Sequence, residues 1–325
     1  MKSPKAQSRF TKGDKILQDI PIACAIESAG VVFMEQQGWG KDPCCPRCGS
    51  ANVYQMQDNR TGQRQKNYRW LCRDCKQGGE KCQYTVRTGT VFEDSKIELR
   101  HWCFAFWLAS TSKKGVSALE IHRHTGLSYK PCLFMLHRIR FAMAPADGNP
   151  LTGIVECDEA YIGGKPRHSR EEREKWSSKV PVLAMIEGGG RVSPKVMADI
   201  TAASLQTAIQ ENVDRCARIM TDELTSYNGI GRHFDGGHDT VNHSKKEYAR
   251  GDVSTSTVEG FFSILKRGLH GIYHSVSKEH LHRYLAEYEF RYNNRELEDS
   301  ERTVAAIKAA EGKRLMYKEP KEKVQ

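Results

Sequence analysis

The chain has 325 residues, of which 38% are hydrophobic and 28% are charged. This composition argues against a wholly disordered chain, and no run approaches the ~18–20 apolar residues that a membrane-spanning helix needs. The N-terminus also lacks the apolar stretch of a secretory signal, so we expect a soluble cytosolic protein with no membrane partner.

The net charge of +10 is unevenly distributed. Residues 1–150 contain 23 Lys and Arg against 13 Asp and Glu, whereas residues 151–325 contain 27 of each class. A basic region joined to a balanced one is typical of a nucleic-acid-binding module attached to a second activity. Many basic proteins bind no anionic partner, so the charge alone leaves this question open.

Residues 1–40 are predicted to form a helical lead-in. Apolar residues recur at helical spacing from Asp14 to Glu35, and we expect Pro21 and Gly30 to interrupt the helix. Nothing in this segment indicates a function.

Residues 41–90 contain two C-x-x-C pairs, Cys45 with Cys48 and Cys72 with Cys75, separated by 23 residues. Two such pairs supply the four thiolates of a closed, tetrahedral structural zinc site. An odd total of 11 cysteines without a signal peptide argues against a disulfide framework. The sequence therefore predicts a zinc ribbon with these four ligands.

Two further cysteines, Cys44 and Cys82, lie in the same segment, and either could replace a member of the ligand set. Basic residues surround the pairs and could contact phosphates, although a solvated basic face is the simpler alternative. They are Arg47, Arg64, Lys66, Arg69, Arg73 and Lys76.

Residues 91–144 are predicted to be helical. The aromatic-rich stretch 97–109 indicates a core helix. A short helix over 117–123, a turn at Gly126 and a second helix from Ser128 to about Arg140 have the spacing of a helix-turn-helix. An ordinary helical hairpin is the alternative.

This prediction assigns two sets of side chains. The candidate core positions are Val116, Leu119, Ile121, Leu127, Leu133, Leu136 and Ile139. The candidates to face DNA are Tyr129, Lys130, His137, Arg138 and Arg140.

After a linker at 145–152, residues 150–295 alternate between strands and helices, followed by a C-terminal helix and charged tail over 296–325. Three antiparallel strands, then helix, strand, helix, strand, helix is the order of an RNase H-like fold. We therefore expect an α/β domain with a mixed five-stranded sheet and flanking helices. The predicted strands are 154–161, 180–187, 191–200, 217–221 and 240–242, and the helices are 203–213, 255–269 and 277–294.

Three acidic residues in this domain form a candidate catalytic set. Asp158 and Asp222 follow apolar strands, and Glu259 begins a helix. In an open sheet, ligands bind at such strand ends. Three carboxylates can hold two Mg²⁺ ions ~3.5–4 Å apart, which is what phosphodiester chemistry needs. Lys266 lies two helical turns after Glu259 on the same face and could contact the DNA backbone.

Neighbouring acids leave alternatives. Strand alternation places Glu156 on the same face as Asp158, so Glu156 competes for its role. Glu159 and Glu223 are expected to point the other way. Each acid alone could also be a solvated loop carboxylate.

The motifs CPRCGS, KKGVSALEIHRHTGLSYK, VECDEAYIGGK, TDELTSY, VNHSKKEY and STVEGFFSILKRGLHGIYHSVSKEHLHRYLAEYEFRYNNR together resemble the zinc-ribbon insertion-sequence transposases of the ISXO type, in the DDE superfamily. The resemblance covers about residues 15–295. It implies an RNase H-like catalytic domain that uses Mg²⁺ or Mn²⁺, with Asp158, Asp222 and Glu259 as metal ligands. Lys266 and the adjacent Arg267 are then expected to contact DNA.

The resemblance further implies a transposase that binds the terminal inverted repeats of an insertion sequence, cleaves a strand and joins the freed 3′-hydroxyl to target DNA. Its partner is double-stranded DNA, it acts as a homo-oligomer, and it works at the nucleoid of a bacterial cytoplasm. A catalytically inactive zinc-dependent DNA-binding regulator and a structure-selective nuclease are the alternatives.

Two details qualify the resemblance. Asn242 and His243 match an Asn-His pair of the family. The family commonly has His-Thr-Asn before the last motif, where this chain has Ser254, Thr255 and Ser256. This chain therefore cannot use that Asn in its active site. Either Glu259 alone supplies the third acidic ligand, or the chain is a decayed copy.

Overall fold

The computed structural model describes residues 15–145, 148–163, 179–241, 249–250 and 253–316. The chain divides into two compact units. The ribbon-and-helix unit comprises residues 1–112, 117–143 and 297–325, and the sheet unit comprises 113–116 and 144–296. The C-terminal helix thus belongs to the first unit, a return of the chain that nothing in the sequence pattern indicates.

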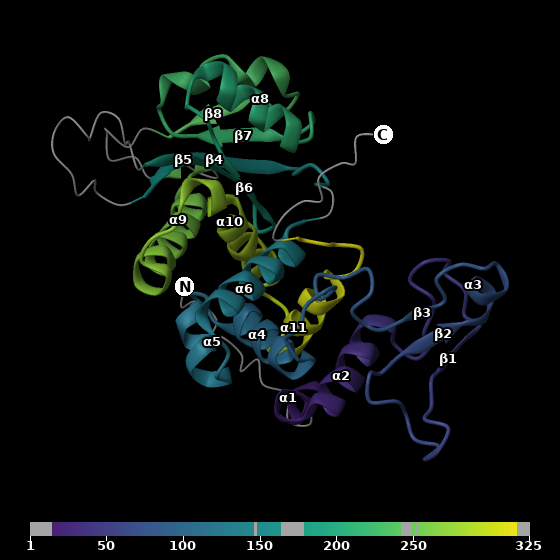
Figure 1. Cartoon of the computed structure of the whole chain (residues 1–325). Helices are drawn as coiled ribbons and strands as arrows, with labels where there is room; N and C mark the ends of the chain where they lie inside the picture. The colour runs from purple at the N-terminus through teal and green to yellow at the C-terminus, as the bar shows by residue number, and fades with distance from the viewer. Residues whose placement is uncertain (1–14, 146–147, 164–178, 242–248, 251–252, 317–325) are drawn as a thin grey trace, which may run out of the picture. The chain divides into compact units, whose positions relative to one another are not determined.

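The ribbon is a three-stranded antiparallel sheet in the order β1-β2-β3 (Figure 1). Its elements are β1 (Val53–Gln55), β2 (Trp70–Cys72), the short helix α3 (Arg73–Gln77) and β3 (Gln83–Tyr84). Trp70 and Tyr84 pack edge-on against Trp39, with ring centroids 5.6 and 5.8 Å away. So small a core cannot hold three short strands alone, which makes a further cross-link necessary.

The helical part of this unit is built around α4 (Leu99–Thr111), against which the other long helices pack. These are α1 (Lys15–Ala25), α2 (Glu27–Trp39), α6 (Tyr129–Met143) and α11 (Asp299–Lys308). Pro21 and Gly30 lie inside helices rather than between them, and the break falls at Ile26, which has extended backbone angles. Gly30 permits close packing, because a Cβ there would lie 2.9 Å from the backbone nitrogen of Arg100.

The predicted helix-turn-helix is formed by α5 (Ala118–Thr125) and α6. The Ser117 side chain caps α5 by accepting the N–H of Glu120, and Gly126 ends it with a left-handed φ of 71°. Among the predicted core positions, Val116, Ile121, Leu136 and Ile139 are buried, while Leu127 and Leu133 are half-buried. The prediction that Leu119 lies in the core is wrong. Its side chain is 51% exposed, because the buried face of α5 contains Ala118 and Ile121 instead.

The sheet unit contains a mixed five-stranded sheet in the order β6-β5-β4-β7-β8. The strands are β4 (Ile154–Ile162), β5 (Val180–Glu187), β6 (Val192–Val196), β7 (Arg218–Thr221) and β8 (His238–Thr240). The first three are antiparallel to one another, and β7 and β8 run parallel to β4. This is the predicted fold class.

The strand boundaries differ from the prediction by more than one residue at two places. β6 ends at Val196, four residues earlier than predicted, and β8 lies at 238–240 rather than 240–242. The connection from β7 to β8 consists of two 3₁₀ turns, η1 (Thr225–Tyr227) and η2 (Ile230–His233). Its polar and glycine-rich sequence carries too little apolar periodicity for a longer helix.

Helices cover both faces of this sheet (Figure 1). One face packs against α8 (Ala202–Asn212), and the other against α9 (Ser256–Gly268) and α10 (Lys278–Asn293). Along β4, Val155 and Cys157 join the α8 core, whereas Ala160 and Ile162 join the α9–α10 core. A short hairpin of β9 (Ala249–Arg250) and β10 (Val253–Ser254) precedes α9, and a π turn, η4 (Leu269–Tyr273), follows it.

None of the helices that the structure describes combines the length and apolar character needed to cross a membrane.

Candidate metal centres and nucleic-acid interface

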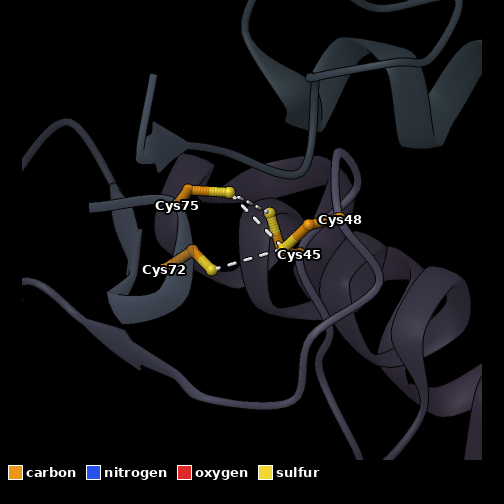
Figure 2. Close-up of side chains that lie close together, drawn as sticks. All are labelled: Cys45, Cys48, Cys72 and Cys75. Atoms are coloured by element: carbon orange, nitrogen blue, oxygen red, sulfur yellow. Dashed lines mark hydrogen bonds between the residues drawn. The ribbon is translucent and has the colours of Figure 1, made fainter. Parts of the chain in front are cut away.

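The four predicted zinc ligands converge in the ribbon. Their sulfur atoms all lie within 4.8 Å of one another (Figure 2). The Sγ–Sγ distances are 3.8 Å for Cys45–Cys75, 3.6 Å for Cys48–Cys72 and 3.4 Å for Cys48–Cys75. A tetrahedron with Zn–S bonds of about 2.3 Å has sulfurs about 3.8 Å apart, so these thiols fit a zinc ion.

The ribbon backbone holds these thiols in place. The N–H of Cys45 donates to the carbonyl of Ser50, and the N–H of Gly49 donates back to Cys45, which closes the first knuckle. The Cys48 thiol and burial raise the pKa of Cys75, because adjacent thiols oppose one another's ionisation. A bound cation removes this opposition by favouring the thiolates.

Cys44 and Cys82, the two alternative ligands, lie outside this four-sulfur group. Cys82 instead packs against the ribbon core, and its carbonyl accepts the N–H of Cys72 at 2.9 Å. Its contribution is therefore to the sheet that carries a ligand.

An acidic cluster lies at one end of the sheet in the second unit. Asp158, Glu159 and Asp222 each place a carboxylate oxygen within 4.8 Å of the others. Strand β7 pairs with β4 through Glu156↔Met220, so continuing that register by two residues sets Asp222 opposite Asp158. Strand β7 ends just before Asp222, which leaves this part of β4 uncovered on that side.

Glu159 adds a third acid to this cluster. It follows the alternation of β4 onto the α8 side, where it meets Tyr227, and its carboxylate nevertheless comes within 4.8 Å of those of Asp158 and Asp222. The buried hydroxyl of Tyr227 donates to Glu159 Oε2 at 2.5 Å and holds it there. Tyr227 lies in η1, five residues after Asp222, so the TDELTSY motif supplies both a member of the cluster and an anchor for another.

Backbone amides fix the two aspartates. The N–H of Glu159 donates to Asp158 Oδ1 at 2.8 Å, and the N–H of Leu224 donates to Asp222 Oδ1 at 3.0 Å. Both bonds are made to Oδ1, so neither of them uses the Oδ2 atom of its aspartate. Glu223, the other acid of this motif, is exposed and outside the cluster.

Crowding of negative charge shows in the pKa values. Burial, together with the charges of Glu159, Asp222 and Glu259, raises the pKa of Asp158 to about 7, against the opposing effect of one backbone hydrogen bond. Burial and the charge of Asp222 also raise the pKa of Glu159. Such a group favours a divalent cation, which would relieve the repulsion, and its oxygen ligands suit Mg²⁺ or Mn²⁺.

Glu259, the predicted third ligand, lies in the first turn of α9 and is exposed. Its charge contributes to the raised pKa of Asp158, which places it within electrostatic reach. It is not part of the compact three-acid group, however. Its role as a ligand therefore stays a prediction.

Glu156, the alternative to Asp158 as a metal ligand, contacts the start of α9 and does not belong to the acidic cluster. It is buried, and its carboxylate accepts the N–H groups of Thr257 and Val258 at 3.0 and 3.2 Å and the Thr257 hydroxyl at 2.9 Å. These bonds occupy it at the N-terminus of α9. Asp158 is thus the residue of this strand face that joins the acidic cluster.

A cavity of about 390 Å³ lies beyond the cluster in the sheet unit. Its lining includes Tyr161 from β4, Lys179 immediately before β5, Lys266 from the last turn of α9 and His270 from η4. The exposed Lys179 and Lys266 make it a cationic cavity. Arg267, the neighbour of Lys266, is exposed as well.

The helix-turn-helix prediction needs a correction in its DNA-facing set. Tyr129 and Lys130 are exposed at the start of α6, but His137, Arg138 and Arg140 are buried. Arg138 donates to the carbonyls of Val91 and Glu93, both at 2.9 Å. Helix α6 turns this basic stretch toward the interior because it packs there against α4 and α11.

Some residues of the last motifs can be placed only in part. Asn242 and His243 lie outside the described residues. Ser254 belongs to β10, Thr255 is the N-cap of α9 and Ser256 is its first residue.

Comparisons with known proteins agree with this arrangement. Residues 27–78 match the transposase zinc-ribbon domain, and residues 150–293 match the ISXO2-like transposase domain. A protein described as an uncharacterized protein in transposable element ISH50 of Halobacterium salinarum is 26% identical over 275 residues. That alignment covers 80% of this chain and 88% of the relative.

Both family matches fall where the corresponding motifs and geometry lie, the ribbon around the four thiols and the transposase domain around the acidic cluster. The chain accordingly belongs to the zinc-ribbon insertion-sequence transposases of the ISXO type, whose DDE domain is that of a nucleic-acid-cleaving enzyme.

Proposed function

We propose that this chain binds the terminal inverted repeats of its insertion sequence, cleaves a DNA strand at the element end and transfers the freed 3′-hydroxyl to target DNA. The observation that carries the proposal is the convergence of Asp158, Glu159 and Asp222 at the end of the sheet, inside a transposase domain. Raised pKa values such as those of Asp158 and Glu159 cluster at functional sites.

In this proposal Asp158 and Asp222 hold the catalytic metal, with Glu259 completing the set from α9. Glu159 is the added candidate from the structure, since it faces both aspartates. Mg²⁺ or Mn²⁺, when bound, supplies charge relief at the scissile phosphate and activation of the attacking oxygen. The protein contributes fixed carboxylate positions, which the amides of Glu159 and Leu224 and the hydroxyl of Tyr227 maintain.

The cationic cavity supports a path for the DNA strand. Tyr161 follows Asp158 by three residues of strand, which is a rise of about 10 Å along β4. Lys266 follows Glu259 by seven residues of helix, which is again a rise of about 10 Å along α9. Both elements therefore lead from the acids to the cavity lined by Lys179, Lys266 and His270. We infer that a backbone phosphate near the scissile one contacts Lys266 there, with Arg267 available to an adjacent phosphate.

DNA recognition is assigned to the ribbon-and-helix unit. Its α5–α6 pair presents Tyr129 and Lys130 at the exposed start of the second helix, where a recognition helix meets base edges and phosphates. Structural zinc would stabilise the ribbon, which belongs to the same unit. We further infer that the active assembly on double-stranded DNA is a homo-oligomer, because one subunit can then hold each element end, and that it acts at the nucleoid in the cytoplasm.

A strand-transfer assay tests the proposal. Purified protein is mixed with Mg²⁺ or Mn²⁺, a labelled duplex of the flanking inverted repeat and supercoiled target plasmid. Wild-type protein should give joined product, and Asp222→Ala should reduce it by at least about 10³-fold, because it removes a carboxylate that faces the reacting phosphate. Asp235→Ala is the matched control, since that exposed aspartate lies elsewhere in the same unit.

Other outcomes separate the alternatives. Cleavage without joining, and without preference for the repeat, would indicate a structure-selective nuclease. Specific binding of the repeat with no chemistry in the folded, zinc-containing wild-type protein would indicate an inactive regulator.

A further inference from the structure

We propose that Glu156 is a positioning residue that locks the N-terminus of α9 onto β4 and thereby sets Glu259 against the acidic cluster. The inference rests on the proposed function, because it concerns the geometry of that site. It assigns a role to the acid of the VECDE motif that does not join the cluster.

The contact uses both carboxylate oxygens of Glu156. Glu156 Oε2 accepts the N–H groups of Thr257 and Val258 at 3.0 and 3.2 Å, and Oε1 accepts the Thr257 hydroxyl at 2.9 Å. The side chain is only 8% exposed, so these three bonds satisfy a charge that burial would otherwise disfavour. The positive end of the helix dipole adds to this attraction.

Helix α9 needs this contact because its own N-cap does not supply it. Thr255 makes no side-chain capping hydrogen bond, and Ser256, Thr257 and Val258 occupy the first three helical positions. The free N–H groups of a helix start require acceptors. Glu156 provides one from a strand that is 101 residues away in the sequence from Thr257.

The contact joins the two segments that carry the reaction. Glu156 is two residues before Asp158 on the same face of β4, and Val258 is immediately before Glu259. Fixing Val258 to Glu156 therefore fixes Glu259 relative to Asp158 within the same unit. A partner that orients a metal ligand in this way typically contributes 10–100-fold to metal affinity or activity.

The test compares Glu156→Ala, Glu156→Gln and a matched control, Glu187→Gln. Glu187 on β5 also accepts a threonine amide and hydroxyl, those of Thr152, but lies outside the acidic cluster. Three readouts are measured on the full chain: hydrogen exchange of the first turn of α9, binding of Mn²⁺, and the Mn²⁺ dependence of strand cleavage.

For Glu156→Ala we expect faster exchange at Thr257 and Val258 and at least a tenfold rise in the Mn²⁺ concentration for half-maximal binding and cleavage. Glu156→Gln keeps an amide oxygen that can accept both N–H groups, so it should recover most of the loss. Glu187→Gln should leave all three readouts unchanged.

Two results would overturn the inference. Glu156→Ala with faster exchange but unchanged Mn²⁺ dependence would make the contact a purely structural cap. Glu156→Gln as damaging to Mn²⁺ binding as Asp158→Ala would make Glu156 itself a ligand. If Asp158→Ala and Asp222→Ala also leave Mn²⁺ binding unchanged, the proposed function fails, while the exchange data still report on the Glu156 contact.

If Glu156→Ala does not fold, Thr257→Val replaces it as the graded variant. It removes only the hydroxyl bond to Glu156. A smaller shift of the Mn²⁺ midpoint in the same direction supports the inference, and no shift contradicts it.

Discussion

The ribbon and the acidic cluster bring their candidate metal ligands together in different ways, one from local pairs and the other from distant segments. The ribbon takes its four thiols from two C-x-x-C pairs, each pair within a few residues of backbone. The acidic cluster takes its carboxylates from β4 and the end of β7, with Glu259 nearby on α9. A local pair needs only a turn to converge, whereas distant carboxylates need the whole sheet in register. The two sites should therefore fail differently.

The largest expected effect is loss of zinc. Cys72→Ser removes one of four thiolates from a site whose binding free energy in comparable domains is about 10–16 kcal/mol. We expect the ribbon to unfold and repeat binding to be lost, while the sheet unit, which shares no residue with the ribbon, keeps its structure. Zinc content and limited proteolysis, read separately for each unit, measure this.

The control for that experiment is Cys82→Ser. Cys82 contributes its backbone carbonyl to β2 rather than a thiolate, so the variant should keep a full equivalent of zinc. Equal zinc loss in the two variants would show that Cys82 belongs to the ligand set.

The next effect is a pH dependence of stability that arises in the acidic cluster and has no counterpart in the ribbon. Burial holds the pKa of Asp158 at about 7, whereas the unfolded side chain titrates near 3.9. Between these values the folded state keeps a proton that the unfolded state releases, so the stability of metal-free protein falls as pH rises from about 4 to about 7. The rise of the pKa from about 3.9 to about 7 sets an upper limit of about 4 kcal/mol on the stability lost over this pH range.

Denaturant titrations of the metal-free sheet unit within the full chain, at intervals from pH 4.5 to 7.5, measure this slope. Asp158→Asn should flatten it. Glu289, whose pKa burial also raises to about 7, contributes equally to both proteins and cancels in the difference. Added Mg²⁺ should flatten the slope of the wild type only, and an identical slope in wild type and variant would contradict the expectation.

A smaller effect should follow from Tyr227. Tyr227→Phe removes the hydroxyl that holds Glu159 in the cluster. We expect cleavage to fall about tenfold, in the range typical of partners that orient metal ligands, with Glu159→Gln at least as severe. Tyr54→Phe on the ribbon is the control, because its ring is 40% exposed and outside the sheet unit. Full activity in Tyr227→Phe would mean that Glu159 needs no anchor.

These sites also differ in how far the sequence could predict them. The C-x-x-C spacing specifies both the ligands and their convergence, so Cys45, Cys48, Cys72 and Cys75 are identifiable from the chain alone. The apolar run before Asp222 identifies the end of β7, but Asp158 lies in the middle of β4 and not at its end. The bond between Tyr227 and Glu159 is not predictable from the sequence, because it depends on how the segment after β7 folds against β4.

The fold shows the same division between local and long-range information. Periodicity predicts the strands β4, β5, β6 and β7, which contain buried residues, and the helices that cover them. It misplaces β8 by two residues, because none of the three residues of β8 is buried. It does not predict that α11 returns to the ribbon-and-helix unit, which depends on tertiary packing against α4. Likewise, the basic residues of α6 resemble a DNA-facing stripe in the sequence until the packing of α4 and α11 against that helix is known.

The smallest effects test that last correction on α6. Arg138→Met leaves the Val91 and Glu93 carbonyls without their donor and should lower the free energy of unfolding by about 1–3 kcal/mol. Its folded fraction should bind repeat DNA with the salt dependence of the wild type. Lys130→Gln, at the exposed start of the helix, should change stability by less than about 0.5 kcal/mol. It should weaken binding a few-fold and reduce the slope of log K against log salt by about one, as loss of one phosphate contact requires. A reduced slope in Arg138→Met would instead mean that α6 exposes its basic stretch when it meets DNA.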